Sequence, residues 1–140
     1  MMIICADPSP IALLVLKRDV KRILPYADVH ICTNADAAKR LAERSSCDVL
    51  ITELDFGRDK GEGILLAEEI KKICPRVNII FATAASEEKY TSRILKIRYS
   101  GYLNKPYTPE ELRTELENLR YVSYENIGCF PRMMADNTEG

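Results

Sequence analysis

The sequence predicts an α/β protein built on a doubly wound sheet of five parallel strands. Its 140 residues correspond to one ordinary domain, and a domain of this size removes roughly two-thirds of its unfolded surface from water. Along the chain, short apolar runs alternate with segments in which apolar residues recur at helical spacing. Strands that alternate with helices pair in parallel through right-handed crossovers, which place helices on both faces of one sheet.

The first strand is predicted at residues 2–6, an unbroken apolar run that ends at Asp7 and Pro8. The segment after it changes to helical period, and Pro25 ends that helix. Its apolar stripe is predicted to consist of Ile11, Leu14, Val15, Val20, Ile23 and Leu24, with Lys17, Arg18, Lys21 and Arg22 between them.

The same alternation continues to residue 119. Further strands are predicted at 29–33, 48–52, 78–82 and 101–104, and further helices at 37–44, 64–73 and 87–97. The last helix begins at Thr108, where Pro109 and Glu111 complete a capping box with proline at the first helical position. Its apolar stripe comprises Leu112, Leu116 and Leu119.

The helical periodicity stops near Tyr121. We therefore predict a domain over residues 1–120, followed by a linker or tail at 121–140 that leads to an output domain outside this chain. From about Tyr124 the tail has no periodic apolar face, so it is predicted to be mobile or held only by crystal or dimer contacts.

Composition and charge exclude several classes. Twenty Lys and Arg against twenty-one Asp and Glu give a net charge of −1, so no basic surplus is available for direct nucleic-acid binding by this domain. Five scattered cysteines without a C-x-x-C pair fit reduced thiols better than a disulfide framework or a zinc site. The opening MMIICADPSP has no cationic leader and too short an apolar run for a membrane span, which predicts a cytoplasmic protein without membrane contact.

Polar residues follow four of the predicted strands. Asp7, Glu53, Thr83 and Lys105 stand at the carboxyl ends of the first, third, fourth and fifth strands. In open parallel sheets, binding and chemistry collect beyond these ends, near the point where the strand order reverses. Two acids, a hydroxyl and an ammonium group are therefore expected to converge in one crevice.

Four motifs in this order, I-C-A-D-P-S-P, D-V-L-I-T-E-L, I-I-F-A-T-A and G-Y-L-N-K-P-Y, resemble the receiver domain of two-component response regulators. The resemblance covers about residues 2–119, and its most specific part is the lysine–proline pair before a capped helix. It implies the flavodoxin-like receiver topology and a cis peptide between Lys105 and Pro106.

The resemblance also implies roles for individual residues. Glu53 occupies the phospho-acceptor position, and Asp7 belongs to the acidic pocket that holds Mg²⁺ in this family. Thr83 and Lys105 match the hydroxyl and the lysine that bind phosphoryl oxygens. Tyr102 matches the aromatic residue whose rotamer follows the hydroxyl.

Two departures affect this chemistry. The family has aspartate where this chain has Glu53, and the second acid after the first strand is replaced by Pro8. A metal site made from Asp7, Glu53 and Asp55 is therefore expected to be weak or absent, since Mg²⁺ requires near-octahedral oxygen ligands. No other cofactor is predicted.

Phosphorylation in the usual way is thus doubtful, and we expect a pseudo-receiver that acts as a signalling and interaction module. Glu53 is either a constitutive mimic of the phosphorylated state or an inert ion-pair partner of Lys105. The open alternative is a working phospho-receiver of a DNA-binding transcriptional regulator that tolerates glutamate or uses Asp55 as acceptor.

An enzymatic function is disfavoured. Dehalogenase-type phosphatases need a second acid two residues after the first, where this chain has Ser9, and a flavodoxin-like cofactor site needs a glycine-rich loop that Asp7–Pro10 does not provide. The expected partners are a histidine kinase or another signalling protein. The resemblance implies that a partner, an output domain or a second copy in a homodimer binds the face formed by the fourth helix, fifth strand and fifth helix. Polar contacts on this face are offered by Arg93, Lys96, Arg98, Tyr99 and Arg113.

Overall fold

The computed structural model describes residues 1–57, 60–85 and 87–119, and it confirms the predicted fold class. The strands are β1 (Met2–Ala6), β2 (Asp28–Cys32), β3 (Val49–Thr52), β4 (Asn78–Thr83) and β5 (Gly101–Asn104). The helices are α1 (Pro10–Ile23), α2 (Ala35–Ser45), α3 (Glu62–Ile73), α4 (Thr91–Lys96), which follows a 3₁₀ turn at Glu87–Tyr90, and α5 (Pro109–Glu117).

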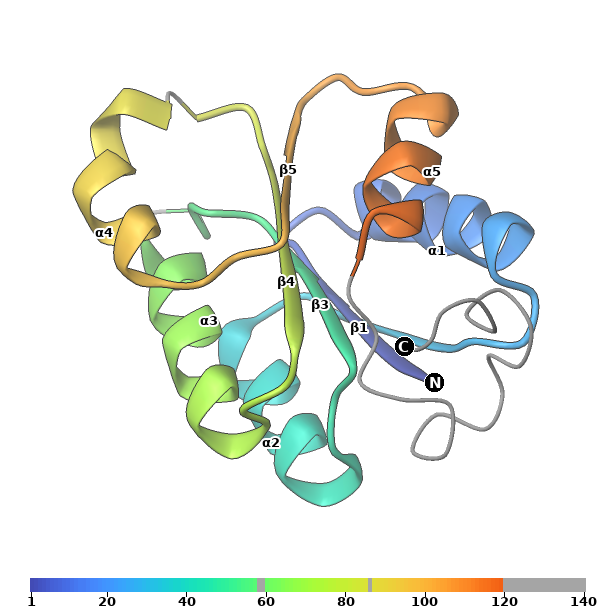
Figure 1. Ribbon diagram of the computed structural model, residues 1–140, viewed down its shortest axis with the longest axis horizontal. Helices are drawn as coiled ribbons and strands as arrows, with labels where there is room; N and C mark the ends of the chain where they lie inside the picture. Colours follow the sequence, from blue (N-terminus) through green and yellow to red (C-terminus); the bar gives the residue numbers. More distant parts are fainter. Residues whose placement is uncertain (58–59, 86, 120–140) are drawn as a thin grey trace.

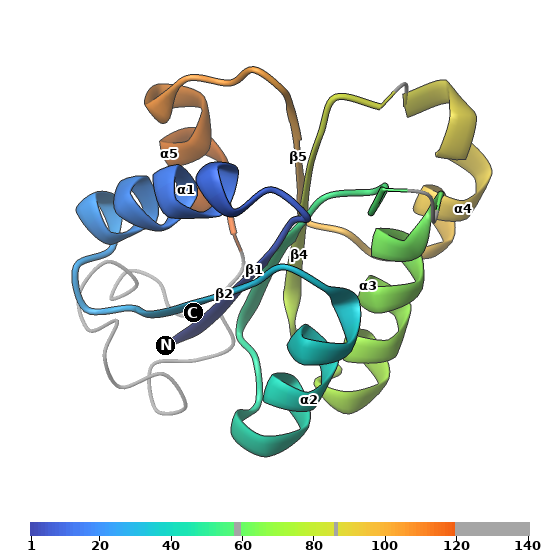
Figure 2. The same cartoon turned by 180° about the vertical axis from the view of Figure 1, so that it is seen from behind.

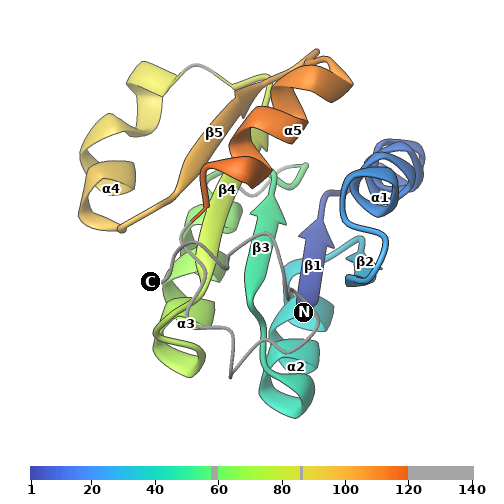
Figure 3. The same cartoon turned by 45° about the vertical axis from the view of Figure 1, so that its right-hand side comes forward.

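The sheet has the strand order β2-β1-β3-β4-β5, and every neighbouring pair is parallel. Helices α1 and α5 cover one face, and α2, α3 and α4 cover the other (Figures 1 and 2). Figure 3 shows that the strands point the same way, so their carboxyl ends share one edge. The strand order reverses at β1, which places the expected crevice beyond the ends of β1 and β3.

Alternate residues of each strand serve opposite faces. In β1, Ile3 and Cys5 pack in the core under α1 and α5, whereas Ile4 and Ala6 pack in the core under α2 and α3. Because both faces are buried, the central strands need apolar residues at every position, which explains the unbroken runs in the sequence.

The predicted apolar stripe of α1 is wrong in the first half of the helix and confirmed in the second. Leu13 and Leu16 face the sheet, whereas Ile11, Leu14 and Val15 are 75%, 60% and 43% exposed. Val20 and Leu24 are buried, as predicted. The segment from Ile11 to Leu16 is apolar at every position, so spacing alone does not determine which side of the helix is buried.

The fourth helix was predicted as one segment over residues 87–97, and this is wrong. A 3₁₀ turn ends at Tyr90, and only Thr91–Lys96 are α-helical. Tyr90 precedes α4 without a side-chain capping bond, and its hydroxyl donates to Asp55 on another loop. At the second helix, Asn34 caps Ala37, so α2 begins at Ala35, two residues earlier than predicted.

The start of α5 agrees with the prediction. The Glu111 amide donates to the Thr108 hydroxyl at 3.1 Å, and the Thr108 amide donates to the Glu111 carboxylate at 2.8 Å. Both bonds of the capping box are therefore present. The peptide between Lys105 and Pro106 is cis, as expected.

The cysteines within the described residues, Cys5, Cys32, Cys47 and Cys74, are buried free thiols. Burial raises the pKa of Cys5 to about 12 and also raises that of Cys47, so both remain protonated near neutral pH. In the part of the chain that the structure covers, no helix has the length and apolar character needed to cross a bilayer. The predicted tail at 121–140 and its mobility lie outside the described residues.

Candidate functional site

Lys105 lies between two carboxylates at the carboxyl edge of the sheet. Its Nζ donates to Asp7 Oδ2 in a short hydrogen bond and to Glu53 Oε1 at 3.1 Å. The Lys105 side chain is 26% exposed, and those of Asp7 and Glu53 are 9% and 12% exposed. We call this set of three residues the Lys105 triad. Its members are separated by up to 98 positions in the chain, so the strand order brings them together.

Backbone hydrogen bonds extend the sheet just past the strands and fix the triad. The amide of Asp7 donates to Cys32 O at 3.1 Å, that of Glu53 to Ala6 O at 3.0 Å, and that of Lys105 to Thr83 O at 2.9 Å. Each triad residue therefore continues the hydrogen-bond pattern of the parallel sheet by one residue past the end of its strand. This registration confirms that Asp7, Glu53 and Lys105 share one edge.

The Glu53 carboxylate folds back over its own loop. Its Oε2 accepts from the Leu54 amide at 2.7 Å and lies 3.4 Å from the Asp55 amide, while Oε1 binds Lys105. The extra methylene of glutamate gives the side chain the length for this turn. Both carboxylate oxygens are consequently occupied by hydrogen bonds.

The triad favours a charged lysine. Burial by itself would lower the pKa of Lys105, but the hydrogen bond and charge of Asp7, followed by those of Glu53, outweigh burial and raise this pKa above its usual value. Lys105 is therefore held as an ammonium ion by two acids.

Thr83 and Tyr102 lie on the neighbouring strands. The Thr83 side chain is buried, and its hydroxyl oxygen accepts from the Ala85 amide at 3.0 Å. The Tyr102 ring packs against the Phe81 ring, and their centroids are 6.5 Å apart. The Tyr102 hydroxyl oxygen is buried. Thr83 thus stabilises the turn after β4, and Tyr102 packs inward beside β4.

The Asp55 side chain binds residues outside the Lys105 triad. Its Oδ1 accepts from the Gly61 amide at 2.8 Å and from the Tyr90 hydroxyl in a very short bond. Burial would raise the pKa of Asp55, but Tyr90 and the Gly61 amide lower it below its usual value. Tyr90 is not among the site residues predicted from the sequence, because its contact with Asp55 spans 35 positions and no local pattern indicates it.

A divalent cation fits this set of ligands poorly. Asp7 and Glu53 both direct an oxygen at the Lys105 ammonium, and Asp55 is engaged by Tyr90 and Gly61. Within residues 1–57, 60–85 and 87–119, no group of three His, Cys, Asp or Glu side chains is arranged to hold a metal ion. Since Mg²⁺ requires several oxygens in near-octahedral geometry, these residues do not form such a site.

The sequence model of the response regulator receiver domain matches residues 3–117 of this chain. The chain belongs to that family. This receiver domain is 30% identical over 121 residues to the transcriptional regulatory protein RcsB of Salmonella typhi, covering 86% of this chain and 56% of that protein. It is 31% identical over 96 residues to the probable transcriptional regulator ycf29 of Porphyra purpurea, covering 67% and 45%. The chain thus spans about half the length of these relatives.

Solved structures agree on the fold. The isolated receiver domain of RcsB from Salmonella enterica serovar Typhimurium, solved with the phosphomimetic BeF3⁻, matches with a TM-score of 0.70 and 27% identity, over 83% of this chain and 85% of that one. A response regulator receiver domain protein from Clostridium thermocellum matches with a TM-score of 0.71 and 24% identity, over 84% and 91%. The flavodoxin-like receiver topology is therefore confirmed.

We expect the free energy of unfolding to fall at alkaline pH because of Tyr90. Burial, the hydrogen bond to Asp55 and the charge of Asp55 raise the pKa of Tyr90 from 10.0 to about 12, so the fold favours the neutral phenol. That stabilisation is complete below pH 10 and is lost as pH rises toward 12. Urea unfolding between pH 8 and pH 11 should show a shallower alkaline decline for Tyr90→Phe than for the unmodified protein. Equal declines would contradict this assignment.

Proposed function

We propose that this receiver domain is a signalling and interaction module that is not phosphorylated in the usual way. The observation that carries the proposal is the Lys105 triad, in which the lysine already binds two carboxylates. In the receiver family the matching lysine binds a phosphoryl oxygen. Here Glu53 supplies it with a permanent negative charge.

The position of Glu53 also argues against attack on a phosphoryl donor. Oε1 is bound to Lys105 and Oε2 to the Leu54 amide, so a nucleophilic oxygen becomes free only after one of these bonds breaks. Transfer also needs an in-line geometry, and a misplacement of about 1 Å can cost on the order of a hundredfold in rate. Pro8 removes, in addition, one carboxylate from the position where the family binds metal.

The proposed partners are suggested by the receiver family and by the exposed face at α4. We propose a cytoplasmic domain over residues 1–120 that receives a signal from a histidine kinase or another signalling protein, with 121–140 leading to an output domain. RcsB from Salmonella enterica has been solved bound to a promoter, which supports a DNA-binding output domain as the first candidate. Leu95 on α4 is 68% exposed beside a hollow of about 240 Å³ that Ile94 and Tyr99 help to line, which supports this face as the contact in a homodimer.

Intact-mass measurement tests the proposal directly. After incubation with Mg²⁺ and a small phosphoryl donor such as acetyl phosphate, the mass of the unmodified protein should not change. The double variant Pro8→Asp with Glu53→Asp should gain about 80 Da on a fraction of molecules, because it restores both acids of the family pattern. Each single variant serves as a matched control and should remain unlabelled, since one defect persists.

The opposite result is equally clear. A gain of about 80 Da by the unmodified protein, removed by hydroxylamine, would establish a working phospho-receiver. Peptide mapping would then show whether Glu53 or Asp55 carries the group. Loss of labelling in Glu53→Gln or in Asp55→Asn would identify the acceptor independently.

A further inference from the structure

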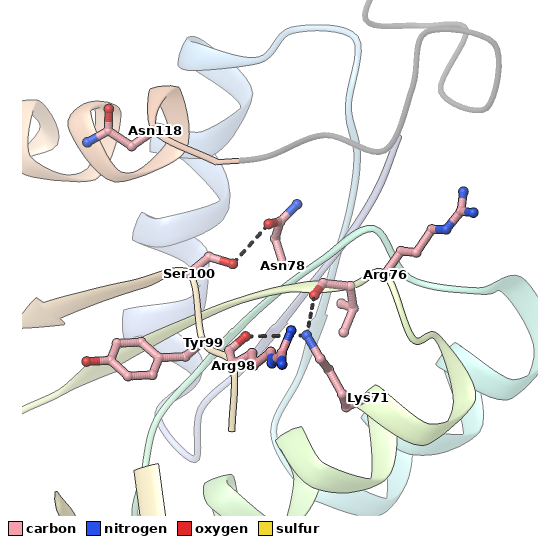
Figure 4. Close-up of a pocket in the computed structure, with 8 residues that line it drawn as sticks. Lys71, Arg76, Asn78, Arg98, Tyr99, Ser100 and Asn118 are labelled. Carbon is pink, nitrogen blue, oxygen red and sulfur yellow. Dashed lines mark hydrogen bonds between the residues drawn. The ribbon is translucent and has the colours of Figure 1, made fainter. Parts of the chain in front are cut away.

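A hollow of about 390 Å³ opens at the amino edge of the sheet, opposite the Lys105 triad. It lies where β4 and β5 begin, beside the last turn of α3 and the end of α5 (Figure 4). Its polar lining consists of Lys71, Arg76, Asn78, Arg98, Ser100 and Asn118. These residues come from three parts of the chain, 71–78, 98–100 and Asn118, so the fold assembles the hollow.

The lining is basic. Lys71, Arg76 and Arg98 bring three positive charges, and none of the lining residues that the structure describes is a carboxylate. Three acids close to these residues have other partners, and one of them is Glu117, next to Asn118, which pairs with Arg113 at 4.0 Å. The Asp48 carboxylate accepts from the Met2 amide at 2.7 Å, and Glu69 pairs with Lys39 and Lys72.

Lys71 is held in place by the backbone. Its Nζ donates to Val77 O at 3.4 Å and to Arg98 O at 3.3 Å, as Figure 4 shows. An ammonium group has three protons, so one donor remains for a ligand. Burial, followed by the charge of Arg98, lowers the pKa of Lys71.

A second hollow of about 490 Å³ adjoins the first and shares Lys71 and Arg98 with it. Lys72 and Lys96 add two further cations there, against the single carboxylate of Glu68. The positive potential therefore extends over both hollows. Lys71 and Arg98 lie at its centre.

We propose that the 390 Å³ hollow binds a small molecule that carries phosphate groups, of the nucleotide or pyrophosphate class. Guanidinium and ammonium groups from separate segments recognise phosphate oxygens through charge-assisted hydrogen bonds. The volume lies in the range of small-molecule sites, about 300–1,000 Å³. A nucleic-acid polymer fits less well, because the chain as a whole has a net charge of −1.

Calorimetric titration of the full chain at low salt tests this site with ADP, pyrophosphate and adenosine as probes. ADP and pyrophosphate should bind with a stoichiometry of one, and adenosine should not bind. Tighter binding of ADP than of pyrophosphate would identify a nucleotide, and equal binding would identify the phosphate groups alone as the recognised part. The double variant Arg76→Gln with Arg98→Gln should weaken binding about tenfold or more, because neither position can then donate a charge-assisted hydrogen bond to a phosphate oxygen.

Two controls keep the result specific. Arg22→Gln removes an exposed positive charge from α1 and should leave binding unchanged. Lys71→Met keeps the aliphatic stem and should weaken binding as the arginine variants do, with an unchanged circular dichroism spectrum. Absence of saturable binding by both phosphate probes would overturn the proposal, and so would equal weakening in Arg22→Gln. Neither outcome bears on phosphorylation at Glu53, which lies at the other edge of the sheet.

Discussion

Replacing Lys105 with methionine should lower the free energy of unfolding by about 2–3 kcal/mol. The variant keeps the aliphatic stem but leaves the carboxylates of Asp7 and Glu53, which are 9% and 12% exposed, without their shared cation. Breaking a fully buried pair costs about 3–5 kcal/mol, and the 26% exposure of Lys105 reduces this value through solvent screening.

A double-mutant cycle measures the interaction itself. Asp7→Asn alone should destabilise the fold, and Asp7→Asn combined with Lys105→Met should cost less than the sum of the two single variants, because they remove opposite charges from one pair. Lys17→Met removes an exposed lysine from α1 and should have little effect. Urea unfolding measures the free energy of unfolding of each variant. If the effects of Asp7→Asn and Lys105→Met add, or if Lys105→Met lowers this free energy by less than about 0.5 kcal/mol, the triad contributes nothing to stability.

Gly63→Ala should destabilise the fold by about 3 kcal/mol or more. A Cβ at this position would lie 1.7 Å from the carbonyl oxygen of Glu53 and 3.0 Å from the Leu54 Cα. Both are backbone atoms, so relief requires that the start of α3 move away from the end of β3. That movement would break the hydrogen bond from the Gly63 amide to Leu54 O, at 2.9 Å.

Gly57→Ala is the matched control. Gly57 has a φ of +62°, but a Cβ there meets nothing within 4 Å, so the cost is only that of a left-handed backbone, about 1–2 kcal/mol. Urea unfolding should therefore rank Gly63→Ala as the more damaging of the two variants. Equal losses would indicate that the contact between α3 and β3 yields readily. The same contact positions Glu53, so Gly63→Ala should also disturb the Lys105 triad.

The sequence alone determined the doubly wound sheet, the ends of its strands to within one residue, and the triad residues that meet there. These features depend on local patterns. A strand buried on both faces needs an unbroken apolar run, and a change to helical period marks the crossover. Once the strands are parallel, Asp7, Glu53 and Lys105 must share an edge, and the structure places them in one triad. The capping box at Thr108 and Glu111 is local as well, and it formed as predicted.

Only the tertiary structure decided which side of α1 is buried, since its first turns are apolar on every side and the packing against α5 and the sheet selects Leu13 and Leu16. It also decided that Asp55 binds Tyr90, a contact between two loops. The basic hollow is assembled from separate segments, such as helix α3, which carries Lys71, and the loop before β5, which carries Arg98. No periodic pattern in the sequence indicates that these segments meet. The physical reason is the same in each case: periodicity encodes how a segment folds, whereas a side chain's partner in a loop depends on the packing of all the segments around it.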